Sequence, residues 1–480
     1  MSHKLAKNTF YLTLASVGQK IIAFVYFLFL ARVMMPENTG SYFLATSLTM
    51  IFSVMTDIGI TAVLIREIAK QPEESKQFAQ KALMLKYPFT IIAVVGMILA
   101  SHLLGYDYYL RSLILIASSI LILDSFQVFF YGMLRGRQEL KYESVGMFVG
   151  MFVTALVGSF VLLTSPSLVW LIVALAIGSF VNLCISSYGV AKTFGTDVFS
   201  PIWDGVFLKK LMRLAIPFAL AAIFIKVYSY IDSIMISKFL GTTEVGLYSI
   251  AYKFTYAFQF LPLAFVAGLY PSFSATISSD PVALKKLFER SLWYMMIIAV
   301  PITFGIWLVA PEAVLMAGSS YASAGSVLRT LVLVLIPIFL DFPVGALLNS
   351  ADRQITKTKI IGITMILNAG LNYLLIPTLG VSGAAYAALF SFTFMFVAGM
   401  TRVPSIIKGF SFRELGWNLG KILFSGFVML LIGFIIKDAF GWILAVPVCA
   451  ISYVLLLFIT KSVHTDELVL MKTLMGRSIK

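Results

Sequence analysis

Two lysines lie deep inside long apolar runs of this sequence. Lys20 lies about twelve residues, or roughly 18 Å, into the first run, which is too deep for its ammonium to reach water easily. Lys226 holds the equivalent place in a later run. A charge at this depth costs about 2.5–3.5 kcal/mol on insertion scales, so it usually faces a cavity or a partner. The pair indicates cations that receive an anionic group in a central cavity. The alternative is that each lysine pairs with a carboxylate and holds helices together.

Four more cations lie nearer to predicted helix ends. Lys253, between Tyr252 and Tyr256, either lines the same cavity or reaches outward to the interface. Three arginines are either interfacial anchors or parts of a basic outer vestibule: Arg32, Arg111 and Arg329.

Carboxylates and amides also occur within the apolar runs. The carboxylates are candidate counter-ions for the lysines, or proton or sodium coupling sites: Asp57, Asp124, Asp232 and Asp341. Asn368 and Asn372 are four residues apart and share one helix face. They are suited to hydrogen bonds between helices, with contact to sugar hydroxyls as the alternative.

The sequence lacks the residue patterns of an enzyme. Its three histidines and two cysteines have no metal-ligand spacing, and both Cys184 and Cys449 are expected to be buried in apolar runs. No Ser/His/Asp or paired-carboxylate arrangement and no ATP-binding P-loop is recognisable. The sequence therefore predicts a protein without catalytic residues, metal or cofactor.

The elements that position these residues are membrane helices. Of 480 residues, 60% are hydrophobic and 12% are charged, whereas soluble domains carry about 25% charged residues. A span needs roughly 20 apolar residues, which predicts fourteen helices: 8–33, 41–65, 84–104, 110–134, 144–164, 168–191, 211–238, 246–271, 290–310, 325–350, 357–377, 383–405, 419–437 and 442–461.

The basic residues that give the net charge of +14 are concentrated in alternate loops and near both ends. The remaining loops are short and nearly free of lysine and arginine. This asymmetry predicts a multi-pass protein of the cytoplasmic (inner) membrane with both termini cytoplasmic, and it argues against a nucleic-acid partner.

The sequence also repeats internally. A shift of 206 residues places Gly40-Ser41-Tyr42 on Gly246-Leu247-Tyr248, and Lys20 on Lys226. We therefore predict an all-α integral membrane fold with two six-helix lobes, residues 1–205 and 206–410, related by a pseudo-twofold axis along the membrane normal. Residues 411–480 would add helices 13 and 14 and a cytoplasmic tail.

Several motifs resemble those of a known family. They run from Leu30-Ala31-Arg32 through Gly40-Ser41-Tyr42 to Asp57-Ile58-Gly59-Ile60, with Gly132-Met133-Leu134-Arg135-Gly136 and the stretch from Asn368 to Ala385 further on. This pattern resembles the polysaccharide exporters of the multidrug/oligosaccharidyl-lipid/polysaccharide superfamily, in particular an O-antigen-flippase-like branch.

The resemblance implies an alternating-access flippase for polyprenyl-pyrophosphate-linked oligosaccharide, with Lys20 and Lys226 as candidate pyrophosphate ligands. It implies membrane lipids and polysaccharide polymerase or assembly proteins as partners. The peptidoglycan-precursor branch uses several cavity arginines, so the lysines here favour surface-polysaccharide units.

Three alternatives remain open from the sequence. They are a peptidoglycan lipid-precursor flippase, a drug–cation antiporter of the same superfamily, and a membrane glycan polymerase or ligase. An enzyme of the last kind needs a large outer loop with catalytic groups, whereas the longest predicted outer loop, 311–324, holds only Glu312.

Overall fold

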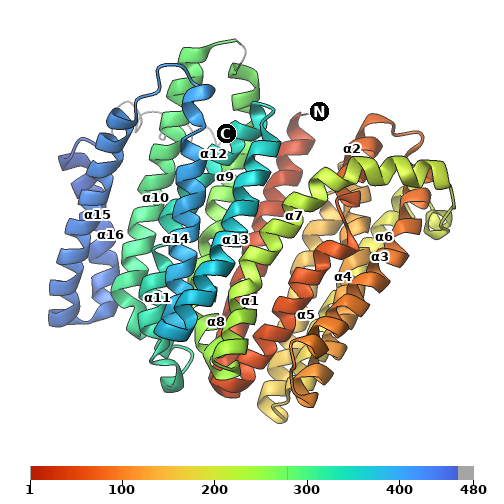
Figure 1. Ribbon diagram of the computed structural model, residues 1–480, viewed down its shortest axis with the longest axis horizontal. Coiled ribbons are helices and arrows are strands. Elements are labelled where there is room, and N and C mark those ends of the chain that lie inside the picture. The colour runs from red at the N-terminus through yellow and green to blue at the C-terminus, as the bar shows by residue number, and fades with distance from the viewer. Residues whose placement is uncertain (1, 278, 463–480) are drawn as a thin grey trace. The chain divides into compact units, whose positions relative to one another are not determined.

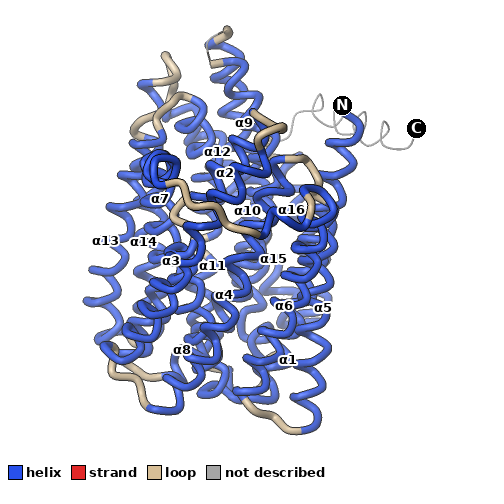
Figure 2. The backbone as a smooth tube through the Cα atoms, turned by 90° about the vertical axis from the view of Figure 1, so that its right-hand side faces the viewer, coloured by secondary structure: helices blue, strands red, loops and turns tan. Residues whose placement is uncertain are grey.

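The computed structural model of the chain describes residues 2–277 and 279–462, without the side chains of residues 2–11, 214, 216–218 and 267. The described residues form helices joined by short connections, and no strand occurs among them (Figure 2). The predicted cytoplasmic tail, residues 463–480, lies outside the described residues.

Sixteen α-helices occur in the described part of the chain, together with short 3-10 turns that include η1 (Ser53–Thr56) and η2 (Thr196–Phe199). The α-helices are α1 (Ser2–Phe52), α2 (Ile60–Lys70), α3 (Ser75–Leu103), α4 (Tyr108–Gly136), α5 (Lys141–Thr164), α6 (Leu168–Phe194), α7 (Gly205–Phe239), α8 (Thr242–Tyr256), α9 (Phe260–Thr276), α10 (Pro281–Leu315), α11 (Ala324–Val332), α12 (Leu335–Ser350), α13 (Gln354–Leu379), α14 (Val381–Met400), α15 (Phe412–Phe440) and α16 (Trp442–Ile459).

Thirteen helical stretches within the described residues are long and apolar enough to cross a membrane. The first stretch, Leu12–Thr56, has 45 residues. At 1.5 Å per residue this is roughly 68 Å, about twice the hydrocarbon thickness. It covers most of the predicted spans 8–33 and 41–65. Between them α1 breaks at Met35, where φ is 64° and ψ is 165°, just before Pro36. The predicted membrane fold of about fourteen helices is therefore confirmed when this stretch is counted as two spans.

The chain forms two compact units, and the first comprises residues 1–253, 317–321 and 361–384. Within it, α4, α5 and α6 run side by side (Figure 1). Gly150 and Gly178 bring α5 and α6 together, because a Cβ atom added at Gly178 would lie 2.6 Å from the Gly150 carbonyl oxygen. Close contact through small residues is typical of membrane helices, which gain little from the hydrophobic effect when they associate.

The two copies of the repeated Gly-x-Tyr motif also meet in the first unit. A Cβ atom at Gly40 would lie 1.8 Å from the Thr242 carbonyl oxygen, and one at Gly246 would lie 2.0 Å from the Pro36 carbonyl oxygen. The second half of α1 and the start of α8 therefore pack backbone against backbone, which only glycine at these two positions allows.

The second unit comprises residues 254–316, 322–360 and 385–480. In it α15 and α16 lie side by side and pack on α10 (Figure 1). The Lys437 ammonium of α15 lies 2.8 Å from the Glu312 carboxylate of α10 and donates to the Leu308 carbonyl at 2.9 Å. Glu312, which the sequence places in an outer loop, is thus part of α10 and attaches α15 to it.

We predict that Gly246→Ala lowers the melting temperature of the purified protein, because overpacking of this kind costs about 1–3 kcal/mol. Gly370→Ala is the matched control in the same unit, since nothing lies within 4 Å of a Cβ atom built there. Alanine is also favoured over glycine in a helix interior. Thermal unfolding in detergent measures both variants, and equal melting temperatures would contradict the close contact.

Candidate functional site

Lys226 and Lys253 border a group of aromatic rings in the first unit. The Lys253 Nζ atom lies 4.8 Å from the ring centroid of Phe27 and 5.8 Å from that of Phe43, both on α1. The Lys226 Nζ atom lies 5.9 Å from the ring centroid of Tyr230 and 4.0 Å from the Met50 sulfur. Both lysines are half-buried.

The rings connect the two lysines. The centroids of Tyr230 and Tyr252 are 6.1 Å apart, and those of Tyr252 and Phe43 are 5.4 Å apart. We call this group the lysine–aromatic cluster; it consists of Phe27, Phe43, Lys226, Tyr230, Tyr252 and Lys253. Contact with an aromatic face stabilises an ammonium by only about 0.5–2 kcal/mol, so each lysine retains the capacity to bind an anion.

Lys20 lies near this cluster along α1. It is exposed, and it precedes Phe27 by two helical turns, so the two residues lie on the same face of the helix. Within the described part of the chain, none of Lys20, Lys226 and Lys253 forms an ion pair with a carboxylate. The alternative for Lys20 and Lys226 was that each pairs with a carboxylate and holds helices together. No such pair occurs among the described residues.

The predicted arginines lie at helix ends and have other contacts. The Arg111 Nε atom donates to the Asp107 carbonyl at 3.4 Å, at the start of α4. In the second unit, the Arg329 guanidinium lies 4.8 Å from the ring centroid of Trp307. Arg32 is exposed, close to the break in α1. These positions fit interfacial anchoring.

Asp232 is a buried carboxylate whose hydrogen-bond donors are uncharged. The Tyr248 hydroxyl of α8 and the Asn372 amide of α13 each donate to it at 2.7 Å. Asn372 also donates to the Asn368 side-chain oxygen at 3.1 Å, and all four residues are buried. The two asparagines thus form the hydrogen bonds between helices that were one of their two predicted roles. A carboxylate in this environment is suited to receive a proton or a small cation.

The internal repeat is asymmetric at this carboxylate. The shift of 206 that places Lys20 on Lys226 also places Tyr26 on Asp232 and Tyr42 on Tyr248. Asp232 accepts a hydrogen bond from Tyr248, whereas the buried Tyr26 hydroxyl has no hydrogen-bond partner among the described residues. The lysine is therefore present in both copies of the repeat, whereas the carboxylate is present in one.

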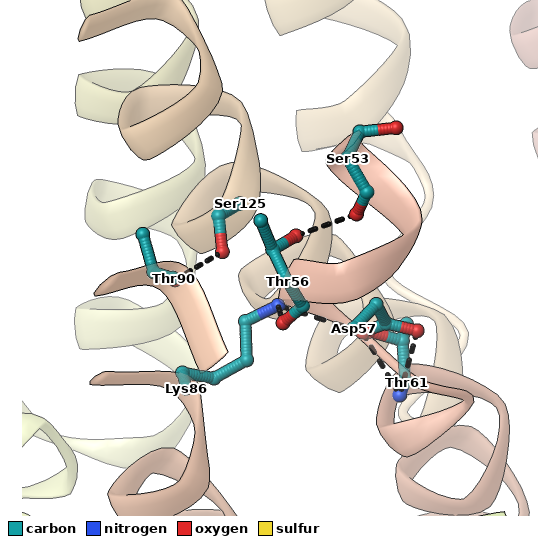
Figure 3. Close-up of polar contacts among 7 residues, drawn as sticks. All are labelled: Ser53, Thr56, Asp57, Thr61, Lys86, Thr90 and Ser125. Carbon is teal, nitrogen blue, oxygen red and sulfur yellow. Dashed lines mark hydrogen bonds and ion pairs between the residues drawn. The ribbon is translucent and has the colours of Figure 1, made fainter. Parts of the chain in front are cut away.

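Asp57 lies at a break between two helices and is close to the buried Lys86, which the sequence did not single out (Figure 3). The fully buried Lys86 Nζ atom donates to the Thr56 carbonyl at 2.8 Å and lies 3.5 Å from Asp57 Oδ1. The chain turns at Gly59, where φ is 77°, and the backbone amide of Thr61 donates to Asp57 at 3.2 Å. Lys86 thus satisfies a carbonyl that the interrupted helix leaves free.

The other two carboxylates also have partners. The Lys357 Nζ atom lies 2.7 Å from each oxygen of Asp341, and connects α13 to α12 in the second unit. Asp124 of α4 has Ser179 of α6 as a polar neighbour. Lys86 and Lys357 were not singled out because they lie in the first turn of the predicted spans 84–104 and 357–377, where a lysine can reach water. α3 begins at Ser75 and α13 at Gln354, so both lysines are further inside a helix than the sequence predicts. Basic residues within the first turn of a predicted span are the signal that could have found them.

Many membrane-spanning helices with cations and a carboxylate inside the spans are typical of membrane transport proteins. The family described as "Polysaccharide biosynthesis protein" matches residues 5–277, more than half of the chain, and the chain belongs to this family. A second family, MatE, matches residues 217–374.

Two similar proteins come from Haloferax volcanii. The "Probable low-salt glycan biosynthesis flippase Agl15" is 22% identical over 430 residues, 88% of this chain and 89% of that protein. The "Probable flippase AglR" is 30% identical over 185 residues, 38% of this chain, and the match spans 39% of that protein.

Solved structures share the fold at 14% identity. The lipid II flippase MurJ, in an inward closed conformation, gives a TM-score of 0.74 over 93% of this chain and 97% of that chain. An inward-facing multidrug resistance MATE transporter of the MOP superfamily gives 0.68 over 82% of this chain and 96% of that chain. These similarities confirm the predicted transporter fold.

We predict that Lys86→Met destabilises the protein, because breaking a buried ion pair costs about 3–5 kcal/mol. Lys20→Met is the matched control, since it removes an exposed lysine that has no described carboxylate partner. Melting temperatures of the two purified variants measure the difference. A Lys86→Met protein as stable as the wild type would show that Lys86 does not support the helix break.

Proposed function

We propose that this protein is a flippase that moves polyprenyl-pyrophosphate-linked oligosaccharide, a repeat unit of surface polysaccharide, across the cytoplasmic membrane by alternating access. The observation that carries the proposal is the lysine–aromatic cluster, in which Lys226 and Lys253 contact rings rather than carboxylates. The family and the names of the Haloferax volcanii relatives support it.

The chemistry of such a substrate matches the cluster. A pyrophosphate headgroup cannot enter hydrocarbon without cations to replace its hydration, and lysine is an effective point-charge partner for phosphate. Aromatic faces such as those of Phe43, Tyr230 and Tyr252 offer apolar surfaces for sugar rings. In this proposal Lys20, Lys226 and Lys253 bind the pyrophosphate and the rings contact the first sugars.

The direction of transport follows from the proposed orientation. The basic loops predict cytoplasmic termini, and lipid-linked repeat units made on the cytoplasmic side must reach the outer leaflet before polymerisation. Polysaccharide polymerase or assembly proteins are the partners that would take the product.

Asp232 is the proposed coupling site. A transporter moves substrate in one direction only if an ion or potential favours one of its two states. Protonation or cation binding at Asp232 would alter its bonds to Tyr248 and Asn372, which come from two other helices.

A drug–cation antiporter is the second candidate. The MatE match over residues 217–374 favours it. Three lysines without described carboxylate partners disfavour it, because they would repel a cationic drug. Efflux of a cationic dye by the purified protein in liposomes would support the antiporter and contradict the flippase.

We predict that Lys226→Gln and Lys253→Gln each reduce translocation of a polyprenyl-pyrophosphate-linked sugar in proteoliposomes by about tenfold or more, because each removes a charge-assisted contact of about 1.5–3 kcal/mol. Lys226→Arg should retain more activity, since it keeps the charge. Lys209→Gln, on the exposed start of α7, is the control and should behave as wild type. Unchanged activity in the Lys226→Gln/Lys253→Gln double variant would remove the site assignment.

We predict that Asp232→Asn abolishes the response of translocation to an imposed proton or sodium gradient, because the isosteric amide cannot ionise. Binding of the substrate to the purified variant should persist. Tyr26→Phe alters the repeat-related position and should leave the gradient response intact. A full gradient response in Asp232→Asn would exclude Asp232 as the coupling site.

A further inference from the structure

Two apolar grooves flank the first turns of α5 in the first unit. One groove, of about 590 Å³, lies between α5 and α6 and is lined by Tyr142, Val181, Cys184, Ile185 and Tyr188. The other, of about 580 Å³, lies between α1 and α5 and is lined by Leu14, Ala15, Phe148 and Val149. Both volumes fall within the range of about 300–1,000 Å³ that is typical of small-ligand sites.

The grooves meet at one cation. Lys141 and Val145 line both of them. Lys141 is at the first position of α5, and its side chain is 62% exposed, with Glu139 at 3.0 Å. This surface therefore has one charged point, at Lys141, next to two apolar grooves.

Aromatic rings form the wall beside this cation. The Lys141 Nζ atom lies 4.9 Å from the ring centroid of Tyr142, and Lys192 Nζ lies 5.9 Å from that of Tyr188. The two rings contact edge to face at 6.3 Å. Gly189 makes room for this arrangement, because a Cβ atom there would lie 2.6 Å from the Tyr142 ring. Tyrosine beside lysine is typical of the membrane–water interface, where phosphate groups lie.

We propose that this surface binds one anionic diacyl phospholipid, with an acyl chain in each groove and the phosphate on Lys141 and Lys192. Two grooves of nearly equal volume that share one lysine match a lipid with two chains and one charged head. A polyprenyl carrier has a single chain and would leave one groove empty. The site is separate from the lysine–aromatic cluster, so the proposal does not depend on the flippase assignment.

The chain provides its own probe of the first groove. Cys184, which the sequence predicts to be buried, is exposed and lines the groove, whereas Cys449 is buried. We expect dioleoyl-phosphatidylglycerol to slow N-ethylmaleimide alkylation of Cys184 several-fold in the full-length protein in detergent, measured by intact mass. Dioleoyl-phosphatidylcholine lacks the net charge, and lyso-phosphatidylglycerol lacks the second acyl chain. Both should protect Cys184 much less.

Lys141→Gln should remove the preference for phosphatidylglycerol. Lys70→Gln is the matched control, because Lys70 is 61% exposed and also pairs with a glutamate, Glu67, at 3.9 Å. An equal loss of the phosphatidylglycerol preference in both variants would overturn the charged site. Equal protection of Cys184 by phosphatidylcholine and phosphatidylglycerol would do the same. Equal protection by the lyso-lipid, or stronger protection by polyprenyl phosphate, would overturn the diacyl occupant. These lipid comparisons use wild-type protein, so they remain decisive if a variant does not fold.

Discussion

An ammonium group inside a membrane span must be compensated, and this protein compensates its buried lysines in two different ways. Lys86, Lys357 and Lys437 each contact a carboxylate from another helical segment and thereby join helices. In the described residues Lys226 and Lys253 instead contact aromatic rings, which replace only part of the lost hydration. The charges of the lysines in the first group are therefore already paired within the fold. The lysines of the second group keep their charge available, and in the proposed function the pyrophosphate of the substrate is their partner.

The helix contacts of the first unit position this second group. Gly40 and Gly246 hold α1 against α8, and Phe43 and Lys253 follow these glycines by one and two turns. Asp232 binds Tyr248 and Asn372, which links α7, α8 and α13 close to Tyr230 and Tyr252. The lysine–aromatic cluster and the Asp232 network therefore share helices α7 and α8. A change at the carboxylate would act on the segments that carry the cations, which is a physical route for coupling.

The helical membrane fold could be predicted from the sequence, because apolar run length and the placement of basic residues depend on the bilayer and not on detailed packing. The repeat also identified Lys20 and Lys226, and it placed Gly40 and Gly246 in equivalent positions. The side chains that contact each lysine could not be predicted from the sequence. Lys86 and Lys357 are at the starts of the predicted spans 84–104 and 357–377, where a lysine can be expected to reach water. The helices begin earlier, at Ser75 and Gln354, so both lysines lie inside a helix and have partners there. The rings around Lys253 come from α1, far away in the sequence, and Cys184 is exposed because α5 and α6 leave a groove beside it.

In the proposed function, Lys20, Lys226 and Lys253 bind a phosphate-bearing lipid head. Equilibrium titration of the purified wild-type protein with polyprenyl pyrophosphate, followed by intrinsic fluorescence, tests it most directly when the uncharged polyprenol of the same length is titrated in parallel. We expect the pyrophosphate to bind, its affinity to fall as the salt concentration is raised, and polyprenol not to displace it. Equal binding of polyprenol and polyprenyl pyrophosphate, with no effect of salt, would contradict it.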